Sequence, residues 1–445
     1  MIEKEKFYYC SFCIIFWVLA MWSFVTQEIP GLGGLVTPIR LVIDMFVVTV
    51  GVSALRNRRD ILVMVSFFLV SFVSSVFVNH ESFLTYINGI REFIGLVFMA
   101  PLVRYVLASP GGGEYKRKID RQILIFLILQ VVAVPYQAVK YGVGDHGGGT
   151  LGDGLSGALS TIVYFATFYL ISQRWDSDNY FSSLRQNWKY LLLLTPTFLN
   201  ETKISFIYLF LFFVFLFSLS WKSVIKGIMM SPLIILLLGG LGYLYLYAAK
   251  IDASFFMDEE FYQAYLFGDD ADRLIEFGDN YENGDYYELE DQWAVDLPRF
   301  FKIFQAPELL ERTDGGLIFG VGNGQFKGGN ALDKTDFARK NELWFRGTIP
   351  MLFDLLIQMG ILGVIWFVCN IVSAMCYRNN LTPMSLNLKV YLTAIIFMQL
   401  FYGQLCTYLV VDLFLFYVLF CSTDLDGLHA GSETEEPDNL EISES

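Results

Sequence analysis

The sequence KIDASFFMDEEFYQAYLFGDDADRLIEFGDNYENGDYYELEDQWAVDLPRF (residues 250–300) opens a polar segment that continues to Arg346. This segment carries about twice as many acidic as basic residues, with tyrosine and phenylalanine interleaved. Apolar runs of helix length precede it and follow it. Because the segment is too long for a simple turn, we expect a folded domain or lid on the outer face of a membrane protein.

The composition places the rest of the chain in the membrane class. Of its 445 residues, 55% are hydrophobic and 17% are charged, and the mean hydropathy is +0.48. Soluble domains carry more charge, and a helix needs about 20 apolar residues to cross a bilayer. The sequence therefore predicts an all-α polytopic membrane protein with about 12 transmembrane helices. The expected helices span residues 7–25, 36–55, 61–78, 84–108, 122–141, 155–173, 189–200, 203–220, 224–247, 348–376, 387–403 and 408–422.

These runs divide the chain into four parts. The first nine helices form a membrane domain at residues 1–247, and the large external loop occupies residues 248–347. The last three helices lie at 348–422, and they are followed by an acidic, disordered tail at 423–445.

Basic residues mark alternate short loops along the chain, among them Lys4, Arg56, Lys116, Arg174, Lys222 and Arg378. Loops rich in lysine and arginine face the cytoplasm. Both termini are therefore predicted to be cytoplasmic, and the long polar segment is predicted to lie outside. The acidic outer surface argues against nucleic acid as a partner, whereas membrane lipid is an expected partner.

Charged residues within the apolar runs gather near the outer ends of the helices. Such residues are costly in a membrane and usually functional. Arg40 and Asp44 are four positions apart and can pair on one helix face. Arg91 and Glu92 lie about 10 Å below an outer helix end. The pattern favours a site that opens to the outer leaflet over a relay across the membrane. For each cation, a structural ion pair or an interface anchor is the alternative.

Glycine is dense between Gly142 and Gly157. Glycine adopts positive φ and lets backbone approach a ligand closely, so we favour a shaped re-entrant turn here. A flexible connection is the alternative interpretation.

Four stretches in fixed order resemble the bacterial O-antigen polymerase and O-antigen ligase superfamily (Wzy-type proteins and their relatives). They are the glycine loop GGTLGDGLSGALS (148–160), the turn NETKIS (200–205), Arg299 followed by LIFGVGNGQF (317–326), and the helix start DLLIQMGILG (354–363). With the helix count and the late external loop, the resemblance covers most of residues 36–422.

The resemblance implies glycosyl transfer at the outer face of the bacterial inner membrane. The donor would be an undecaprenyl-diphosphate-linked oligosaccharide and the acceptor a sugar hydroxyl of another lipid-linked chain. The product would be O-antigen, capsule or exopolysaccharide, with a chain-length regulator and a flippase as further partners. No metal and no other cofactor are expected, because the long loop has acids without a His/Cys set or tight ligand spacing.

The leaving diphosphate develops charge that needs fixed cations, and the planar guanidinium matches phosphate oxygens. We expect Arg91, Lys203 and Arg299 to contact the diphosphate, with Arg346 next.

A carboxylate would deprotonate the acceptor hydroxyl, with Glu201 or Glu342 as candidates. Trp293, Tyr286 and Tyr287 would stack on sugars. An apolar core for the loop is the alternative role for these aromatic residues.

Ligases of the superfamily carry a histidine in the long loop, shortly before the helix start. Here the histidines are His80, His146 and His429, and none lies there. This departure favours a polymerase over a ligase and leaves the general base unassigned. A transporter or flippase for lipid-linked glycan is the other alternative. We see no matched halves of the kind that transporter repeats produce.

Overall fold

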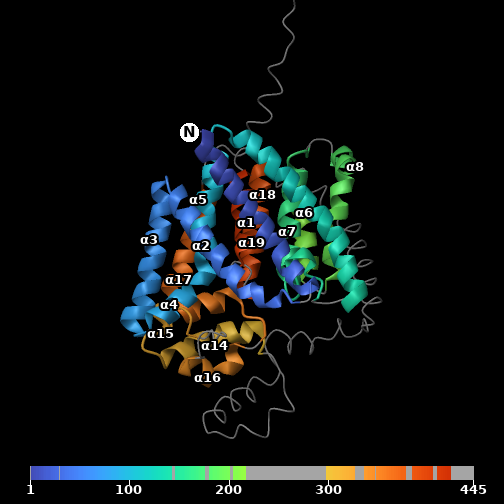
Figure 1. Ribbon diagram of the computed structural model, residues 1–445. Helices are drawn as coiled ribbons and strands as arrows, with labels where there is room; N and C mark the ends of the chain where they lie inside the picture. Colours follow the sequence, from blue (N-terminus) through green and yellow to red (C-terminus); the bar gives the residue numbers. More distant parts are fainter. Residues whose placement is uncertain are drawn as a thin grey trace, which may run out of the picture.

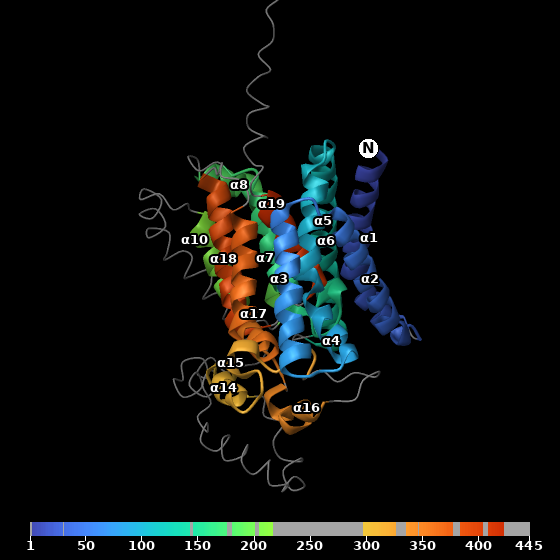
Figure 2. The ribbon, with the colours of Figure 1, turned by 90° about the vertical axis from the view of Figure 1, so that its left-hand side faces the viewer.

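Long helices run side by side and form a bundle (Figures 1 and 2). The computed structural model describes residues 2–29, 31–142, 146–175, 180–200, 204–216, 297–325, 335–345, 347–376, 383–403 and 408–421. Every element within these ranges is helical. The bundle elements are α1 (Ile2–Glu28), η1 (Gly33–Leu35), α2 (Val36–Ala54), α3 (Arg58–Phe72), η2 (Val73–Val78), α4 (Phe83–Ile90), η3 (Arg91–Phe93), α5 (Ile94–Ala108), α6 (Gly112–Tyr141), η4 (Gly149–Leu151), α7 (Ser156–Ser172), α8 (Tyr180–Leu191), η5 (Leu192–Leu194), α9 (Pro196–Leu199), α10 (Ile204–Leu216), α17 (Met351–Met375), α18 (Pro383–Tyr402) and α19 (Leu409–Cys421).

Five helices of this bundle are long and apolar enough to cross a membrane. They are Lys4–Glu28, Gly33–Ala54, Arg58–Val78, Gly112–Tyr141 and Met351–Met375. Shorter apolar helices accompany them at Ser156–Ser172, Ile204–Leu216, Asn387–Tyr402 and Leu409–Cys421. The described residues therefore agree with the all-α membrane class expected from the sequence. The expected helix at 224–247 lies outside the described residues.

Helices α7 and α19 form the centre of the bundle. Every residue of α19 is buried, and so is every residue of α7 except Gly157. A helix that is apolar all round is a buried helix. Tyr169 of α7 and Tyr417 of α19 both donate hydrogen bonds to Oδ1 of Asp120 on α6, at 2.9 and 2.6 Å.

The described residues from 297 to 345 form a helical unit, which we call the cap. It contains α14 (Arg299–Glu311), α15 (Gly316–Phe319), α16 (Asp336–Lys340) and η8 (Glu342–Phe345). The cap lies at one end of the bundle, and the first residues of α1 lie at the other (Figures 1 and 2). Its apolar residues form a small core with the start of α17: Ile303, Ala306, Leu310, Val321, Ala338, Ile349, Phe353 and Ile357. The cap is therefore packed onto the bundle through α17.

Two helices are interrupted at this same end. The sequence predicts one helix over 84–108, but the structure breaks it at η3, between α4 and α5. Helix α17 is broken at Gly360, where φ is +64°. The carbonyl oxygen of Ile318 approaches there so closely that an added Cβ on Gly360 would lie 2.2 Å from it. Only glycine fits this conformation and this contact.

The glycine loop after α6 forms a buried turn over residues 148–151. Gln137 of α6 binds both backbone groups of Gly149: the Gly149 N–H donates to Oε1 at 2.6 Å, and Nε2 donates to the Gly149 carbonyl at 2.9 Å. Gln130 of the same helix accepts from the Thr150 N–H at 2.8 Å. This part of the loop is thus the shaped turn that the sequence favours, held in place by two glutamine side chains.

Candidate functional site

Two arginines share one buried carboxylate at the cap end of the bundle. Arg40 Nε donates to Asp44 Oδ1 at 3.0 Å, as the i,i+4 spacing predicts. Arg91 donates to Asp44 Oδ2 through Nε at 3.0 Å and Nη2 at 2.8 Å. The Asp44 side chain is 3% exposed, whereas Arg40 is 39% and Arg91 is 29% exposed. Each guanidinium is therefore held on one side and open on another.

A second carboxylate lies close to this triad, in the first turn of α19. Asp412 is fully buried, and neither of its oxygens has a hydrogen-bond partner within the described part of the chain. It packs against Gly95 of α5, where an added Cβ would lie 1.9 Å from Asp412 Oδ2. Arg40 is close enough to act on its charge. The triad and Asp412 together place four charged side chains among α2, η3, α5 and α19.

Glu92, the neighbour of Arg91, links the bundle to the helix that carries the cap. Gln358 of α17 donates from Nε2 to Glu92 Oε2 at 3.2 Å and to Asp354 Oδ1 at 2.7 Å. Its Oε1 accepts from Asn323 Nδ2 at 3.3 Å. The Asn323 N–H donates to Ser75 Oγ at 2.7 Å. All of these side chains are at least half buried, so the network joins four segments without exposing its polar groups.

The glycine turn that follows α15 is docked into this network. The N–H groups of Val321 and Gly322 donate to the carbonyls of Ile357 and Gln358, at 2.7 and 3.1 Å. Asn79 Nδ2 donates to the Gly320 carbonyl at 3.0 Å, and the Ser74 hydroxyl donates to the Phe319 carbonyl. The motif used for the family resemblance therefore lies between η2 and the break in α17.

Glu81, in the connection between η2 and α4, contacts the same glycine turn. An added Cβ on Gly322 would lie 2.4 Å from Glu81 Oε1. Burial raises the pKa of Glu81 to about 8, and the nearby Ser75 hydroxyl and Gln325 side chain counteract that shift only in part. The glycine turn thus covers a carboxyl group that is ready to hold a proton near neutral pH.

Arg299 lies at the start of α14 and contacts the ends of two bundle helices. Its guanidinium carbon lies 3.8 Å from the centre of the Tyr402 ring, and its Nη2 donates to Thr348 Oγ1 at 3.4 Å. Lys302, one turn later, is buried and donates to the Thr348 carbonyl at 3.2 Å. Thr348 lies before the start of α17 at Met351, whereas Gln358 lies within that helix. Arg299 therefore contacts the segment before α17, and Glu92, the neighbour of Arg91, contacts the helix itself.

The described residues include three of the predicted site residues. Arg91 is in the triad, Arg299 stacks on Tyr402, and Glu342 opens η8 in the cap. The other predicted residues lie outside the described residues, namely Glu201, Lys203, Arg346, Trp293, Tyr286 and Tyr287.

Sequence reasoning missed several members of the polar network. The only feature of the sequence that pointed to Gln358 is its i,i+4 spacing from Asp354, which allows the two side chains to pair. Glu81 and Ser75 had no signal, because a lone carboxylate in a short loop and a serine in an apolar run are both ordinary. Their role depends on the glycine turn, which lies more than 200 positions along the chain.

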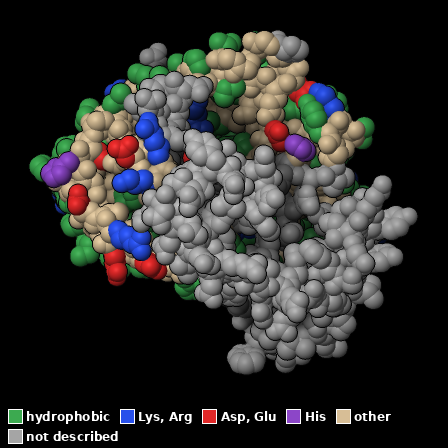
Figure 3. Space-filling view, turned by 90° about the horizontal axis from the view of Figure 1, so that it is seen from below, with side chains coloured by type: hydrophobic (Ala, Val, Ile, Leu, Met, Phe, Trp, Pro, Cys, Tyr) green, Lys and Arg blue, Asp and Glu red, His purple; other side chains and the backbone are tan. Residues whose placement is uncertain are grey.

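Basic and acidic side chains are interspersed on the described part of the cap face (Figure 3). In comparisons with known proteins, no protein-family model and no curated protein matches the chain.

Proposed function

We propose that this protein joins lipid-linked oligosaccharide repeat units into a surface polysaccharide at the cap end of its helix bundle. The donor would be an undecaprenyl-diphosphate-linked glycan, and the cap would face the outside of the bacterial inner membrane. The single observation that carries the proposal is the triad, in which Asp44 holds Arg40 and Arg91 while both guanidinium groups stay partly open.

The charges of the triad suit an anionic head group. Within the triad, two guanidinium groups share one carboxylate, so neither is fully occupied by it. Arginine presents paired N–H donors that match phosphate oxygens. Because Arg91 is oriented by two hydrogen bonds to one oxygen, its remaining donors are held in a fixed direction before a ligand arrives.

In the proposed reaction, an acceptor hydroxyl oxygen forms a bond to the anomeric carbon of the donor sugar. The bond from that carbon to the phosphate oxygen breaks, and the electron pair stays with the departing diphosphate. Arg91 and Arg40 would stabilise this charge. The acceptor proton would pass to a carboxylate of the cap, for which Glu342 is the described candidate.

The test uses a strain that lacks its own copy of this gene, complemented with Arg91→Gln or Arg91→Lys. We expect Arg91→Gln to leave single repeat units on the surface glycan and Arg91→Lys to restore only short chains. Arg312→Gln, on the exposed side of the cap, is the matched control. Full-length polymer with Arg91→Gln at normal protein level contradicts the proposal. Loss of all exported glycan in the deletion strain would instead indicate a flippase.

A further inference from the structure

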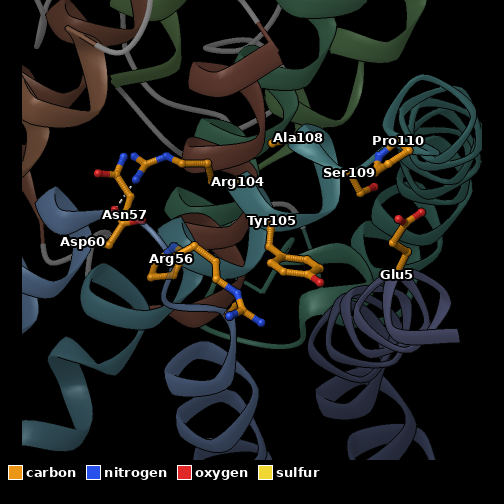
Figure 4. A pocket seen from close by; sticks show the side chains of 11 residues that line it. Glu5, Arg56, Asn57, Asp60, Arg104, Tyr105, Ala108, Ser109 and Pro110 are labelled. Atoms are coloured by element: carbon orange, nitrogen blue, oxygen red, sulfur yellow. Dashed lines mark hydrogen bonds and ion pairs between the residues drawn. The ribbon is translucent and has the colours of Figure 1, made fainter. Parts of the chain in front are cut away.

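A separate cavity is lined by Glu5 near the start of α1, which lies at the end of the bundle opposite the cap (Figures 1 and 2), and Figure 4 shows its lining side chains. Its volume is about 380 Å³, which is within the range of small-molecule pockets. The start of α1, the α2–α3 turn, α5 and the α5–α6 turn surround it. The end of α2 also contributes through Ala54, but none of the lining residues belongs to the triad of Arg40, Asp44 and Arg91, so this is a different site.

One side of the cavity is closed by an ion pair. Arg104 of α5 donates to Asp60 at the start of α3, and both side chains are nearly buried. The Arg104 guanidinium also lies over the ring of Phe420, 4.6 Å from its centre. These contacts hold Arg104 against the wall and neutralise Asp60.

Two other charged residues line the cavity without such a pairing. Glu5 of α1 is 8% exposed and has no hydrogen bond or ion pair to another described residue. Arg56 in the α2–α3 turn is exposed, and its guanidinium carbon lies 5.9 Å from the centre of the Tyr105 ring. In Figure 4 the Tyr105 ring lies between the Arg104–Asp60 pair and Glu5.

These charges select one ligand chemistry. A carboxylate that is mostly removed from water and unpaired among the described residues is unfavourable, and an ammonium group that enters the cavity would relieve that cost. Arg56 at the rim suits a phosphate. An anion without a cationic group would bring its charge towards Glu5, and a simple amine would leave Arg56 without a partner.

We propose that this cavity binds a phosphoethanolamine group, with its ammonium at Glu5 and its phosphate at Arg56. The group can come from a phosphatidylethanolamine lipid in the adjacent leaflet or from the free head group. A bound lipid of this kind would join α1, α3 and α5 at the end remote from the cap.

The test uses the full-length protein, purified in detergent and stripped of lipid. Native mass spectrometry measures the binding of phosphatidylethanolamine, phosphatidylglycerol and phosphatidylcholine, and calorimetry measures the binding of free phosphoethanolamine. We expect phosphatidylethanolamine to bind roughly tenfold more tightly than phosphatidylglycerol, since hydrogen bonds between charged groups are strong.

Glu5→Gln should abolish this preference, and Arg56→Gln should weaken binding of all three lipids. The controls are Glu114→Gln and Arg58→Gln, exposed residues at the same end that do not line the cavity. Thermal melting without lipid verifies that each variant is folded.

If phosphatidylethanolamine binds and free phosphoethanolamine does not, the membrane is the source of the ligand. If free phosphoethanolamine binds equally well, the ligand is soluble. Either result supports the site. Equal affinity of the wild type for all three lipids, or an unchanged preference in Glu5→Gln, overturns it.

Discussion

Arg91 Nη2 lies 2.8 Å from Asp44 Oδ2, although the two residues are 47 positions apart in the chain. The contact joins η3, where the predicted fourth helix is broken, to the middle of α2. Because Arg40 binds the other oxygen of the same carboxylate, Asp44 controls the direction of both guanidinium groups.

Replacing Asp44 with asparagine should therefore disable both arginines at once. We expect Asp44→Asn to destabilise the protein by about 1–3 kcal/mol, since the two guanidinium groups lose a charged acceptor, and to shorten the polysaccharide. The thermal midpoint of the purified protein and gel analysis of the surface glycan measure the two effects. In the Asp44→Asn background, Arg91→Gln should have little further effect, because neighbouring residues that share a partner are not additive.

Asp336→Asn is the matched control, because Asp336 lies on the exposed side of the cap. If the effects of Asp44→Asn and Arg91→Gln simply add, Asp44 does not act through Arg91.

Gly320 tests whether docking of the glycine turn needs a residue without a side chain, with Gly316 as the comparison. Gly320 and Gly316 both have positive φ, +68° and +53°. An added Cβ on Gly320 would lie 2.4 Å from the Ile357 carbonyl oxygen, whereas one on Gly316 would meet nothing within 4 Å. Alanine at Gly320 also costs about 1–3 kcal/mol of strain, because its φ of +68° and ψ of −162° lie in a region that is essentially restricted to glycine. We expect only Gly320→Ala to undock the turn as well.

Hydrogen exchange of the Val321 and Gly322 amides measures this undocking, because both amides donate to α17. Exchange should become faster in Gly320→Ala and stay at the wild-type rate in Gly316→Ala. Equal exchange in the two variants would show that the turn tolerates the extra carbon.

The sequence was sufficient to predict features that depend on residue spacing along a single helix. The Arg40–Asp44 pair follows from the i,i+4 rule, and the bounds of α2 and α7 lie within one residue of the expected ranges. It placed the charged residues of the apolar runs near one end, whereas the structure also buries the Arg104–Asp60 pair at the other end. It did not predict that Arg91 reaches Asp44, because a continuous helix over 84–108 has no break at η3.

From the sequence, Arg91 and Arg299 are expected to contact the same diphosphate. Spacing along the chain cannot show whether two residues so far apart in sequence lie close together. Arg299 stacks on Tyr402, and Arg91 binds Asp44. Which helix end receives the cap is decided by packing, through stacked rings such as Phe300 of α14 on Phe401 of α18. Aromatic residues are frequent throughout this chain, so the sequence did not mark that pair.

Glu81 makes docking of the glycine turn dependent on pH. Its pKa rises from an ordinary value of 4.5 to about 8 in the folded protein. Between these two values the folded state binds more protons than the unfolded state, so the free energy of unfolding falls as pH rises. Its effect is absent below pH 4.5 and reaches its limit, up to about 5 kcal/mol, above pH 8.

We expect Glu81→Gln to remove this part of the pH dependence, since the amide stays neutral. The thermal midpoint at pH 5 and at pH 8.5 measures it in the wild type, in Glu81→Gln and in the exposed-site control Glu308→Gln. The prediction fails when Glu81→Gln loses as much stability between the two pH values as the wild type does.

Arg299 can anchor the cap or bind the diphosphate, and a double-mutant cycle distinguishes the two roles. The guanidinium carbon lies 3.8 Å from the centre of the Tyr402 ring, within cation–π range, and such a contact is worth about 0.5–2 kcal/mol. We expect Arg299→Ala and Tyr402→Leu to be coupled by this amount in the thermal stability of the purified protein. Arg299→Lys should lose part of the coupling, because an ammonium has no planar face to stack.

Arg312→Lys is the control, at the exposed position that directly follows α14. Polysaccharide length supplies the second measurement. If Arg299 anchors the cap, polysaccharide length and thermal midpoint should fall together, since each variant loosens the start of α14 on α18. The variants are Arg299→Lys, Arg299→Ala and Tyr402→Leu. A direct diphosphate contact predicts that Arg299→Ala shortens the chains while Tyr402→Leu leaves them long. Because Arg299 contacts both Tyr402 and Thr348 at the ends of bundle segments, we expect the first result.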